Sequence, residues 1–390
     1  MATMSFYPQD PRVQREAEAL ARRSVAVDIV CLRGHGQPAR EQLGSVTAHR
    51  VLHIGEKSSV PKYIWLSILF FRAAAAALAT LYRQQRFDLI QVHNLPDYLV
   101  YIARPFKKKG IPVLLDLHDL MPELFVSRWP SRLSRPFAAL IEQAHRSSCS
   151  FADHLLTASE GFARQLQRRG VPPERVTLVL NSADHHIFNV DRPPRRQREG
   201  PPRLLYHGTM APRFGIHHLI DGIDRLRSSL GEVTLQLHGN YDTAYRRQLE
   251  RQVQTLGLAG CVRFGEYLSL EKIRTVIDWA DIGVVPYASD PFMDLALSTK
   301  VFEYIAMGLP VVVSRLPSVT GLFAEDCLQY FQPGDPEDLA RKISELWADP
   351  LRSDVLCANA LAAYQPLAWP IMERRYLDVI TRLTGVELAS

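Results

Sequence analysis

Lys300 and Glu303 stand three residues apart in the segment LSTKVFEYIAMGLPVVV, residues 297–313. The segment predicts a helix that ends at a glycine and is followed at once by an apolar strand. Its N-terminus is expected at Leu297, Ser298 and Thr299. A helix N-terminus offers free backbone N–H groups and the positive end of the helix dipole, so this one can bind a phosphate, and Lys300 adds a full positive charge.

Glu303 lies one turn further along the predicted helix. Its carboxylate can accept hydrogen bonds from two neighbouring hydroxyl groups, as a carboxylate does with a ribose in dinucleotide-binding folds. The pair would then hold two ends of one ligand, with phosphate at the helix tip and ribose one turn in. The alternative is an ordinary capped helix that carries a solvated lysine–glutamate pair.

A second loop, YHGTMAPRFGI at residues 206–216, also has a composition that suits phosphate. Gly208 and Gly215 allow close approach of the backbone, and Arg213 can supply a positive charge. The loop matches neither the GxGxxG fingerprint nor the P-loop, so by itself it is a weak signal. Two helix N-termini at one sheet edge would form an anion site, and a nucleoside diphosphate is the expected occupant.

Short apolar runs alternate with longer amphipathic segments along the chain. In the first half, the predicted strands are residues 24–32, 88–93, 112–118, 154–159 and 175–181. The predicted helices there are residues 14–23, 63–82, 97–109, 136–148 and 160–170. A proline- and arginine-rich stretch, residues 190–203, is typical of an exposed linker, and the alternation restarts after it. We predict an α/β fold of two doubly wound, Rossmann-like domains that face a central cleft.

The composition favours a globular protein without metal sites. The chain has 390 residues, 47% of them hydrophobic, and five scattered cysteines without zinc-site spacing. The adjacent His185 and His186 point apart and have no third ligand nearby, so no metal site is predicted. No signal peptide pattern is present, and we expect a cytoplasmic protein. Residues 63–81 are apolar, but Arg72 stands near their centre, so we expect a buried or surface-lying helix and not a membrane span.

Positive charge is concentrated in the first half of the chain. Residues 1–190 contain 24 lysines and arginines and 16 aspartates and glutamates, whereas the whole chain has a net charge of +5. The basic run RPFKKKG, residues 104–110, is either a solvated surface or a contact for an anionic membrane or polyanionic acceptor. No nucleic-acid-binding motif accompanies it, so no nucleic-acid partner is expected.

Four segments in order carry a family resemblance: DPRVQREAEAL (10–20), ADHLLTASEGFARQL (152–166), HGTMAPRFG (207–215) and STKVFEYIAMGLPVVVS (298–314). Together they resemble the family 4 retaining glycosyltransferases, which have the GT-B fold. The resemblance implies transfer of a sugar, of the hexosyltransferase type, from a nucleotide-diphosphate sugar. It also implies retention at the anomeric carbon and no requirement for a metal or other cofactor.

The resemblance further implies a division of labour between the domains. Residues 1–189 would bind the acceptor, residues 204–365 would bind the nucleotide-sugar donor, and a helix in residues 366–390 would pack back on the first domain. From the basic first half of the chain and the apolar residues 63–81, and not from the resemblance, we expect the acceptor to be a lipid-linked or polysaccharide intermediate of cell-envelope synthesis, with the protein peripheral on the cytoplasmic face of the inner membrane. The family opens with a full strand, whereas nine residues precede Asp10, so we expect a frayed first strand.

Residues of the second domain can be assigned one by one from the resemblance. Glu303 matches the glutamate that binds the nucleotide ribose, and the amides at the start of its helix match the diphosphate cradle. Thr209 and Phe214 stand where the family usually has an arginine and a lysine. Arg213 and Lys300 are therefore expected to supply the missing charge and to act in catalysis.

The sugar and base contacts depart further from the family pattern. The first glutamate of the E-x7-E motif would fall at Leu295, and we expect Asp294 beside it to bind the sugar hydroxyls. Gly208 and Thr209 are assigned to the donor loop. Tyr267, at the end of another predicted strand, either stacks on the base or packs in the core.

In the first domain, the segment PVLLDLHDLMPE places His118 at the carboxyl end of a strand. The family carries a histidine there that faces the donor sugar, so we expect His118 to act in catalysis, although a histidine beside Asp119 can also be structural. His93 ends the strand DLIQVH, and both a functional and a structural role are open for it. Arg12, His93 and Asp119 are assigned to the acceptor side.

Two other functions are compatible with these residues. A GT-B sugar-nucleotide epimerase would need the same nucleotide site together with carboxylates poised for proton transfer, and the leucine at position 295 counts against it. A non-catalytic GT-B scaffold that binds a partner enzyme is favoured by the departures at Thr209, Phe214 and Leu295.

Overall fold

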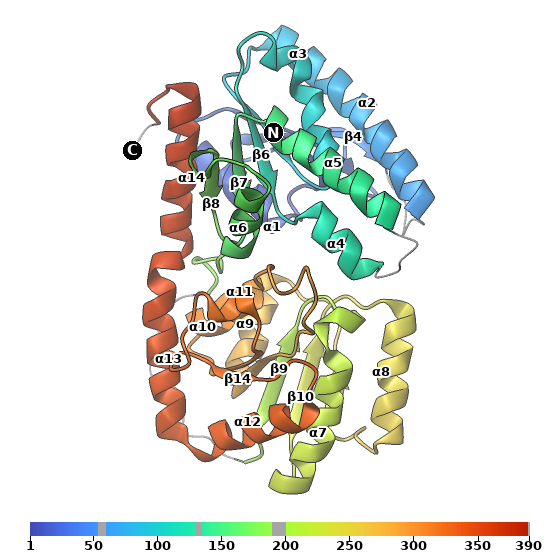
Figure 1. Cartoon of the computed structure of the whole chain (residues 1–390), viewed down its shortest axis with the longest axis vertical. Coiled ribbons are helices and arrows are strands. Elements are labelled where there is room, and N and C mark those ends of the chain that lie inside the picture. The colour runs from blue at the N-terminus through green and yellow to red at the C-terminus, as the bar shows by residue number, and fades with distance from the viewer. Residues whose placement is uncertain (54–59, 130–134, 189–199, 389–390) are drawn as a thin grey trace. The chain divides into compact units, whose positions relative to one another are not determined.

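The computed structural model describes residues 1–53, 60–129, 135–188 and 200–388. The chain forms two compact α/β units (Figure 1). The first comprises Met1–Leu180 and Met372–Ser390, and the second comprises Asn181–Ile371. Residues 181–188, which we expected in the first domain, therefore group by their contacts with the second. The predicted linker lies largely outside the described residues.

An eight-stranded sheet forms the centre of the first unit. Its strands are β1 (Ala2–Phe6), β2 (Val27–Arg33), β3 (Arg40–Leu43), β4 (Val46–His53), β5 (Ile90–His93), β6 (Val113–Leu117), β7 (His154–Thr157) and β8 (Val176–Leu178). Their order is β3-β4-β2-β1-β5-β6-β7-β8, and every neighbouring pair is parallel except β3 with β4. The expectation of a frayed first strand is wrong, because β1 lies between β2 and β5 and its Ala2 pairs with both Val30 and Val92.

Helices cover both faces of this sheet, as the alternating sequence pattern predicts. They are α1 (Pro11–Arg22), α2 (Val60–Gln84), the 3-10 helix η1 (Asp97–Ala103), α3 (Arg104–Lys107), α4 (Met121–Arg128), α5 (Arg135–Phe151), α6 (Glu160–Arg168), η3 (Pro173–Arg175) and α14 (Trp369–Thr384). The last helix, α14, packs on this unit, where the Tyr376 hydroxyl donates to Gln91 Oε1 at 2.7 Å. An ion pair of 3.1 Å between Arg22 and Glu373 adds a surface contact.

The second unit contains a fully parallel, six-stranded sheet. Its strands are β9 (Arg203–His207), β10 (Thr234–His238), β11 (Val262–Phe264), β12 (Ile282–Val285), β13 (Val311–Ser314) and β14 (Gln329–Phe331). Its helices are η4 (Pro212–Phe214), α7 (Ile216–Leu230), α8 (Thr243–Thr255), α9 (Leu270–Trp279), α10 (Thr299–Ala306), α11 (Pro317–Thr320), α12 (Pro336–Ala348), α13 (Pro350–Tyr364) and η5 (Gln365–Leu367).

The strand order of the second sheet fixes where a ligand can bind. The order β11-β10-β9-β12-β13-β14 reverses direction between β9 and β12, the switch point of a doubly wound sheet. At such a point the two following loops turn to opposite faces and leave a crevice beyond the carboxyl ends of the strands. The loops that follow β9 and β12 are the two segments predicted from the sequence to bind phosphate.

Candidate functional site

The two predicted phosphate loops lie next to each other at the carboxyl edge of the second sheet. The amide of Ala288, in the loop after β12, donates to the carbonyl of Arg213, in the loop after β9, at 3.0 Å. Gly215 has a φ of +65°, and a Cβ there would lie 1.8 Å from the carbonyl oxygen of Pro286. Only glycine therefore lets the two loops approach this closely.

Lys300 fills the space beside Gly208 and is 8% exposed. Its Nζ donates to the Tyr287 hydroxyl and to Ser298 Oγ, the latter at 3.4 Å. A Cβ on Gly208 would come within 3.1 Å of Nζ, so the glycine leaves room for the lysine. Nζ also lies 4.8 Å from the ring centroids of both Tyr206 and Tyr287. Within the part of the chain that the structure describes, Lys300 has no carboxylate partner.

Arg213 brings a second cation to the same place. The Phe214 ring centroid lies 5.4 Å from Arg213 Cζ and 5.9 Å from Lys300 Nζ. On another side, the Arg213 guanidinium lies 5.8 Å from the Phe292 ring centroid. Its Nη1 is buried and has no hydrogen-bond partner among the described residues. Because a buried charge is costly without a partner, this pair of cations is suited to an anionic ligand.

Glu303 lies one turn into α10 and is 5% exposed. Its Oε2 is 3.2 Å from Nε2 of His207, the last residue of β9. Burial lowers the pKa of His207 well below its usual value, and the charge of Lys300 lowers it further, so His207 is neutral. The carboxylate oxygens of Glu303 can accept hydrogen bonds from hydroxyl groups of a ligand. The helix begins at Thr299, so Leu297 precedes it and does not belong to its first turn.

The remaining residues assigned to the donor differ in exposure. Asp294 is half-buried and accepts from Ser289 Oγ at 2.9 and 3.1 Å. Burial raises the pKa of Asp294. The Thr209 carbonyl accepts from the Tyr206 hydroxyl at 2.7 Å, which orders the loop after β9. Tyr267 is 68% exposed, which contradicts packing in the core and leaves its ring open to a ligand.

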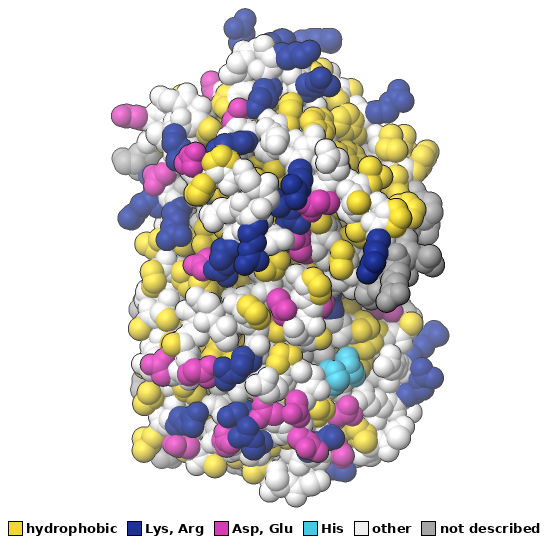
Figure 2. All heavy atoms as spheres, viewed as in Figure 1, with side chains coloured by type: hydrophobic (Ala, Val, Ile, Leu, Met, Phe, Trp, Pro, Cys, Tyr) yellow, Lys and Arg dark blue, Asp and Glu magenta, His cyan; other side chains and the backbone are white. Residues whose placement is uncertain are grey.

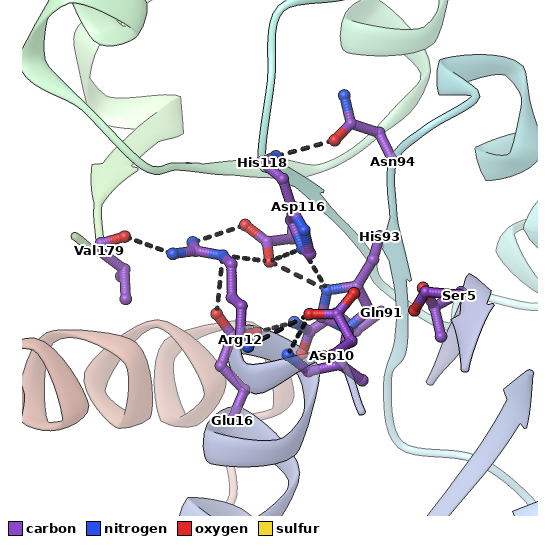
Figure 3. A network of polar contacts seen from close by, with 12 residues as sticks. Ser5, Asp10, Arg12, Glu16, Gln91, His93, Asn94, Asp116, His118 and Val179 are labelled. Carbon is purple, nitrogen blue, oxygen red and sulfur yellow. Dashed lines mark hydrogen bonds and ion pairs between the residues drawn. The ribbon is translucent and has the colours of Figure 1, made fainter. Parts of the chain in front are cut away.

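On the first unit, three predicted residues converge on one that we did not predict, Asp116 (Figure 3). Arg12 Nε and Nη2 donate to the two carboxylate oxygens of Asp116, each at 2.7 Å. His93 Nδ1 and His118 Nε2 both lie 3.0 Å from Oδ2. Arg12 is 4% exposed, and its Nη1 donates to the carbonyl of Val179 at 2.6 Å. Its guanidinium thus holds Asp116 in place and is not directed at an acceptor.

The charges in this cluster set its protonation states. Burial opposes a charge on Asp116, but Arg12 and His118 together hold the pKa of Asp116 well below its usual value. Burial likewise opposes the imidazolium of His118, yet Asp116 outweighs it and the pKa of His118 is raised. Burial lowers the pKa of His93. An ionised carboxylate therefore lies between a guanidinium and a histidine that favours its charged form.

The spacing in this cluster also resembles a metal site. His93, Asp116 and His118 each offer a ligand atom, and these atoms lie within 4.8 Å of one another. However, both oxygens of Asp116 accept from Arg12, and the charge of that guanidinium would repel a divalent cation. The residues fit an ion-pair cluster better than a metal centre.

His118 is the member of the cluster that reaches the surface, with a side chain 18% exposed. Its amide donates to Asn94 Oδ1 at 2.8 Å, and Asn94 Nδ2 donates to the Asp119 carbonyl at 2.6 Å and to Asp97 at 2.8 Å. Asp97 in turn bonds His145 of α5 at 2.7 Å. Asn94 therefore fixes the loop after β6 by hydrogen bonds to the backbone of both His118 and Asp119.

Three residues of these sites were not predicted from the sequence. Asp116 could have been predicted, because a single carboxylate inside the apolar strand VLLDL must have a partner when it is buried. His207 stands at the carboxyl end of β9, directly before the predicted donor loop. Tyr287 is 13 residues from Lys300, and no spacing rule connects the two.

Two Rossmann-like units, the second with Lys300 and Arg213 beside its switch point, define a protein of the GT-B class. The chain belongs to the glycosyltransferases of this class. Residues 9–182 match the glycosyl transferase 4-like domain, and residues 201–349 match the glycosyl transferases group 1 domain. Together the two matches cover most of the chain.

Individual relatives and solved structures agree with this assignment. D-inositol 3-phosphate glycosyltransferase of Thermomonospora curvata is 22% identical over 392 residues, which cover 94% of this chain and 88% of that protein. Glycogen synthase of Mycobacterium tuberculosis is 28% identical over 231 residues, which cover 57% and 52%. Sucrose-phosphate synthase from Thermosynechococcus elongatus superimposes with a TM-score of 0.78 at 19% identity, covering 99% of this chain and 96% of that one. Anabaena HepE in complex with UDP-glucose has a TM-score of 0.71 at 17% identity and 98% coverage of both. These structures confirm the predicted fold.

Proposed function

We propose that this glycosyltransferase moves a hexose from a nucleotide-diphosphate sugar to a lipid-linked or polysaccharide acceptor, with retention and without a metal. One observation supports the donor class above all. Lys300 is buried at the switch point of the second sheet, beside Arg213, with no carboxylate partner among the described residues. A diphosphate supplies the charge that such a pair of cations needs.

The donor would bind in extended form along the carboxyl edge of the second sheet. Its diphosphate would meet Lys300, Arg213 and the N-terminus of α10, and its ribose would donate to Glu303. Asp294 would bind sugar hydroxyls, and the exposed ring of Tyr267 would stack on the base. HepE, a structural neighbour, was solved in complex with UDP and with UDP-glucose, which supports a donor of this class.

The chemical step would rely on charge stabilisation and not on a protein nucleophile. In a same-face reaction the leaving diphosphate takes the proton of the acceptor hydroxyl, while Lys300 and Arg213 stabilise the negative charge that develops on it. His118 would face the transferred sugar, and its raised pKa favours the imidazolium, which can donate a hydrogen bond to a sugar hydroxyl.

This function can be tested by following release of the nucleoside diphosphate. The purified protein would be incubated in EDTA with UDP-, GDP-, ADP- or dTDP-glucose and a bacterial lipid extract. We expect release from one of the four donors, dependent on the extract, together with label from the sugar in the lipid or polymer fraction. Tight nucleotide binding with no release under any acceptor condition would contradict transfer.

A non-catalytic scaffold is the second candidate, because Phe214 occupies a position where the family usually has a lysine. The same assay separates it from the transferase, since a scaffold gives binding without turnover. An epimerase would convert the free sugar nucleotide without any acceptor, which chromatography of the donor pool would reveal.

A further inference from the structure

Large hydrophobic side chains are exposed on one region of the first unit. Among the described residues, eight of the twelve exposed large hydrophobic side chains belong to α2, α4 and α5. We call them the apolar face: Tyr63, Ile64, Trp65 and Ile68 of α2, Val126 and Trp129 at the end of α4, and Phe137 and Leu140 of α5. Single exposed hydrophobic residues are ordinary on a protein surface, whereas a group of this size marks a contact with a partner or a membrane.

The three segments are held together by specific contacts. Ser67 of α2 bonds the Tyr98 hydroxyl of η1, and the Tyr101 hydroxyl of η1 lies 2.7 Å from Ser147 Oγ of α5. The helices α2 and α5 therefore both pack on η1. Arg169 joins α4 to α5, because its Nη2 donates at 2.7 Å to carboxylates on both helices. Figure 2 shows hydrophobic side chains gathered over the part of the first unit where Figure 1 places α2 and α5.

Among the described residues of α2, α4 and α5, the charges without an ion-pair partner are positive. The exposed cations on these segments include Lys62, Arg72, Arg128 and Arg135. The acidic residues of α2, α4 and α5 are Glu123 and Glu142, and both are bonded to Arg169. The face therefore offers a hydrophobic centre with uncompensated positive charge around it, which is the pattern that binds anionic lipid headgroups.

One helix of the face is long and apolar enough to cross a membrane. Over residues 62–84, α2 has an 18-residue window with a mean hydropathy of 1.9, of which 28% is buried. Its other side contacts the first unit, where Phe70, Ala74 and Leu78 are buried. A helix with one packed side and one bare apolar side suits a position in the plane of the membrane surface.

The topology places the apolar face near the predicted acceptor residues. The helices α2 and α5 each run toward the starting end of the strand that follows, so both begin on the carboxyl side of the sheet. Helix α4 starts three residues after His118, on that same side. The apolar start of each long helix therefore lies at the sheet edge that carries His93 and His118.

We propose that the apolar face is a docking surface for an anionic lipid bilayer. It would place the carboxyl edge of the first sheet at the membrane surface, where a lipid-linked acceptor presents its headgroup; this last step rests on the proposed function. A second copy of the chain is a poorer occupant, because a two-fold contact would bring the same ring of cations from both copies together. Tyr63, Trp65 and Trp129 are residue types enriched at membrane interfaces.

Vesicle flotation tests the docking surface. The protein would be mixed at low salt with vesicles of phosphatidylcholine alone or of phosphatidylcholine with phosphatidylglycerol. We expect the wild type to float with the anionic vesicles only, and the double variant Ile64→Asp/Leu140→Asp to lose at least about tenfold in vesicle affinity. The matched control is Leu351→Asp/Val355→Asp, which changes two exposed hydrophobic residues of α13 in the second unit and should float as the wild type does.

Thermal unfolding and nucleotide binding show whether a loss of flotation comes from misfolding. Thermal unfolding and nucleotide binding of each variant should match the wild type, because the changed side chains are exposed and none of them belongs to the proposed donor site. Equal flotation of the face variant and its control, or no flotation of the wild type, would overturn the docking surface while leaving sugar transfer intact. Sedimentation that shows a wild-type dimer disrupted by Ile64→Asp/Leu140→Asp would assign the face to self-association instead.

Discussion

Replacing Lys300 by methionine is expected to lower kcat roughly 10²- to 10³-fold, the usual cost of removing one group that stabilises charge in the transition state. Methionine keeps most of the side-chain volume and removes the charge beside Tyr287 and Gly208. The melting temperature without ligand should stay equal to that of the wild type or rise, because a buried cation without a carboxylate partner is removed. Steady-state kinetics and thermal unfolding of the same preparation measure both effects.

The matched control for this variant is Lys272→Met, which removes the charge of an exposed lysine on α9 of the same unit. It should change neither kcat nor the melting temperature appreciably. Turnover of Lys300→Met at the wild-type rate would remove Lys300 from the chemical step and would weaken the assignment of the anion site.

Replacing Asp116 by asparagine is expected to destabilise the first unit by about 3–5 kcal/mol, because it removes the carboxylate that accepts two hydrogen bonds from the buried guanidinium of Arg12 and leaves only Glu16, 3.4 Å away, as a carboxylate contact. Removing both ends of the pair in Arg12→Met/Asp116→Leu should cost less than the single change, since the guanidinium is removed with its main partner and the remaining carboxyl group, Glu16, has a pKa that burial raises to about 8, so it can stay protonated. Urea unfolding of the single and double variants measures this difference. Glu160→Gln, at an exposed ion pair with Arg164, is the control and should cost no more than about 0.5 kcal/mol.

The dependence of the unfolding free energy on pH should also differ between the wild type and Asp116→Asn, which a defect in packing alone would not cause. Because Asp116 raises the pKa of His118 in the folded protein, the stabilisation from this pair is complete below the ordinary histidine value of 6.5 and is lost as the pH rises through the folded-state pKa. Unfolding free energies of the wild type should fall over that range. In Asp116→Asn this part of the pH dependence should disappear, and its persistence would contradict the role given to Asp116.

Strands and helices could be predicted from the sequence where apolar and polar residues alternate regularly. The prediction was wrong where strand pairing or a proline determines the structure. The inner strands β5, β6 and β13 are short apolar runs bounded by loops, and the sequence predicts each of them. The strand β3 was missed, because REQL is polar and partly exposed at the sheet edge, where pairing with β4 and not hydrophobicity defines it. Residues 97–109, predicted as one helix, divide into η1 and α3, with Pro105 at the start of α3.

Single residues of the candidate site could be predicted from the sequence, but the contacts between their side chains could not. Helix periodicity and the glycine-containing loop indicated Lys300, Glu303 and Arg213, because local spacing determines where a helix begins. The contacts of Lys300 with Tyr287 and of Arg12 with Asp116 join residues 13 and 104 positions apart, and only the sheet topology brings them together. The role of Arg12 changed for this reason, from a predicted acceptor contact to a buried partner of Asp116.

The most direct test of the central claim is the thermal shift of the wild-type protein with UDP, GDP, ADP and dTDP, each in EDTA and in magnesium, beside Lys300→Met. A ligand that binds the folded state alone raises the melting temperature, by about 2.7 kcal/mol of stability at a hundredfold excess over Kd. We predict that one of the four nucleotides stabilises the wild type equally in EDTA and in magnesium and that Lys300→Met loses most of this shift. No shift with any nucleotide, or a shift that needs magnesium, would contradict a metal-independent diphosphate site at Lys300.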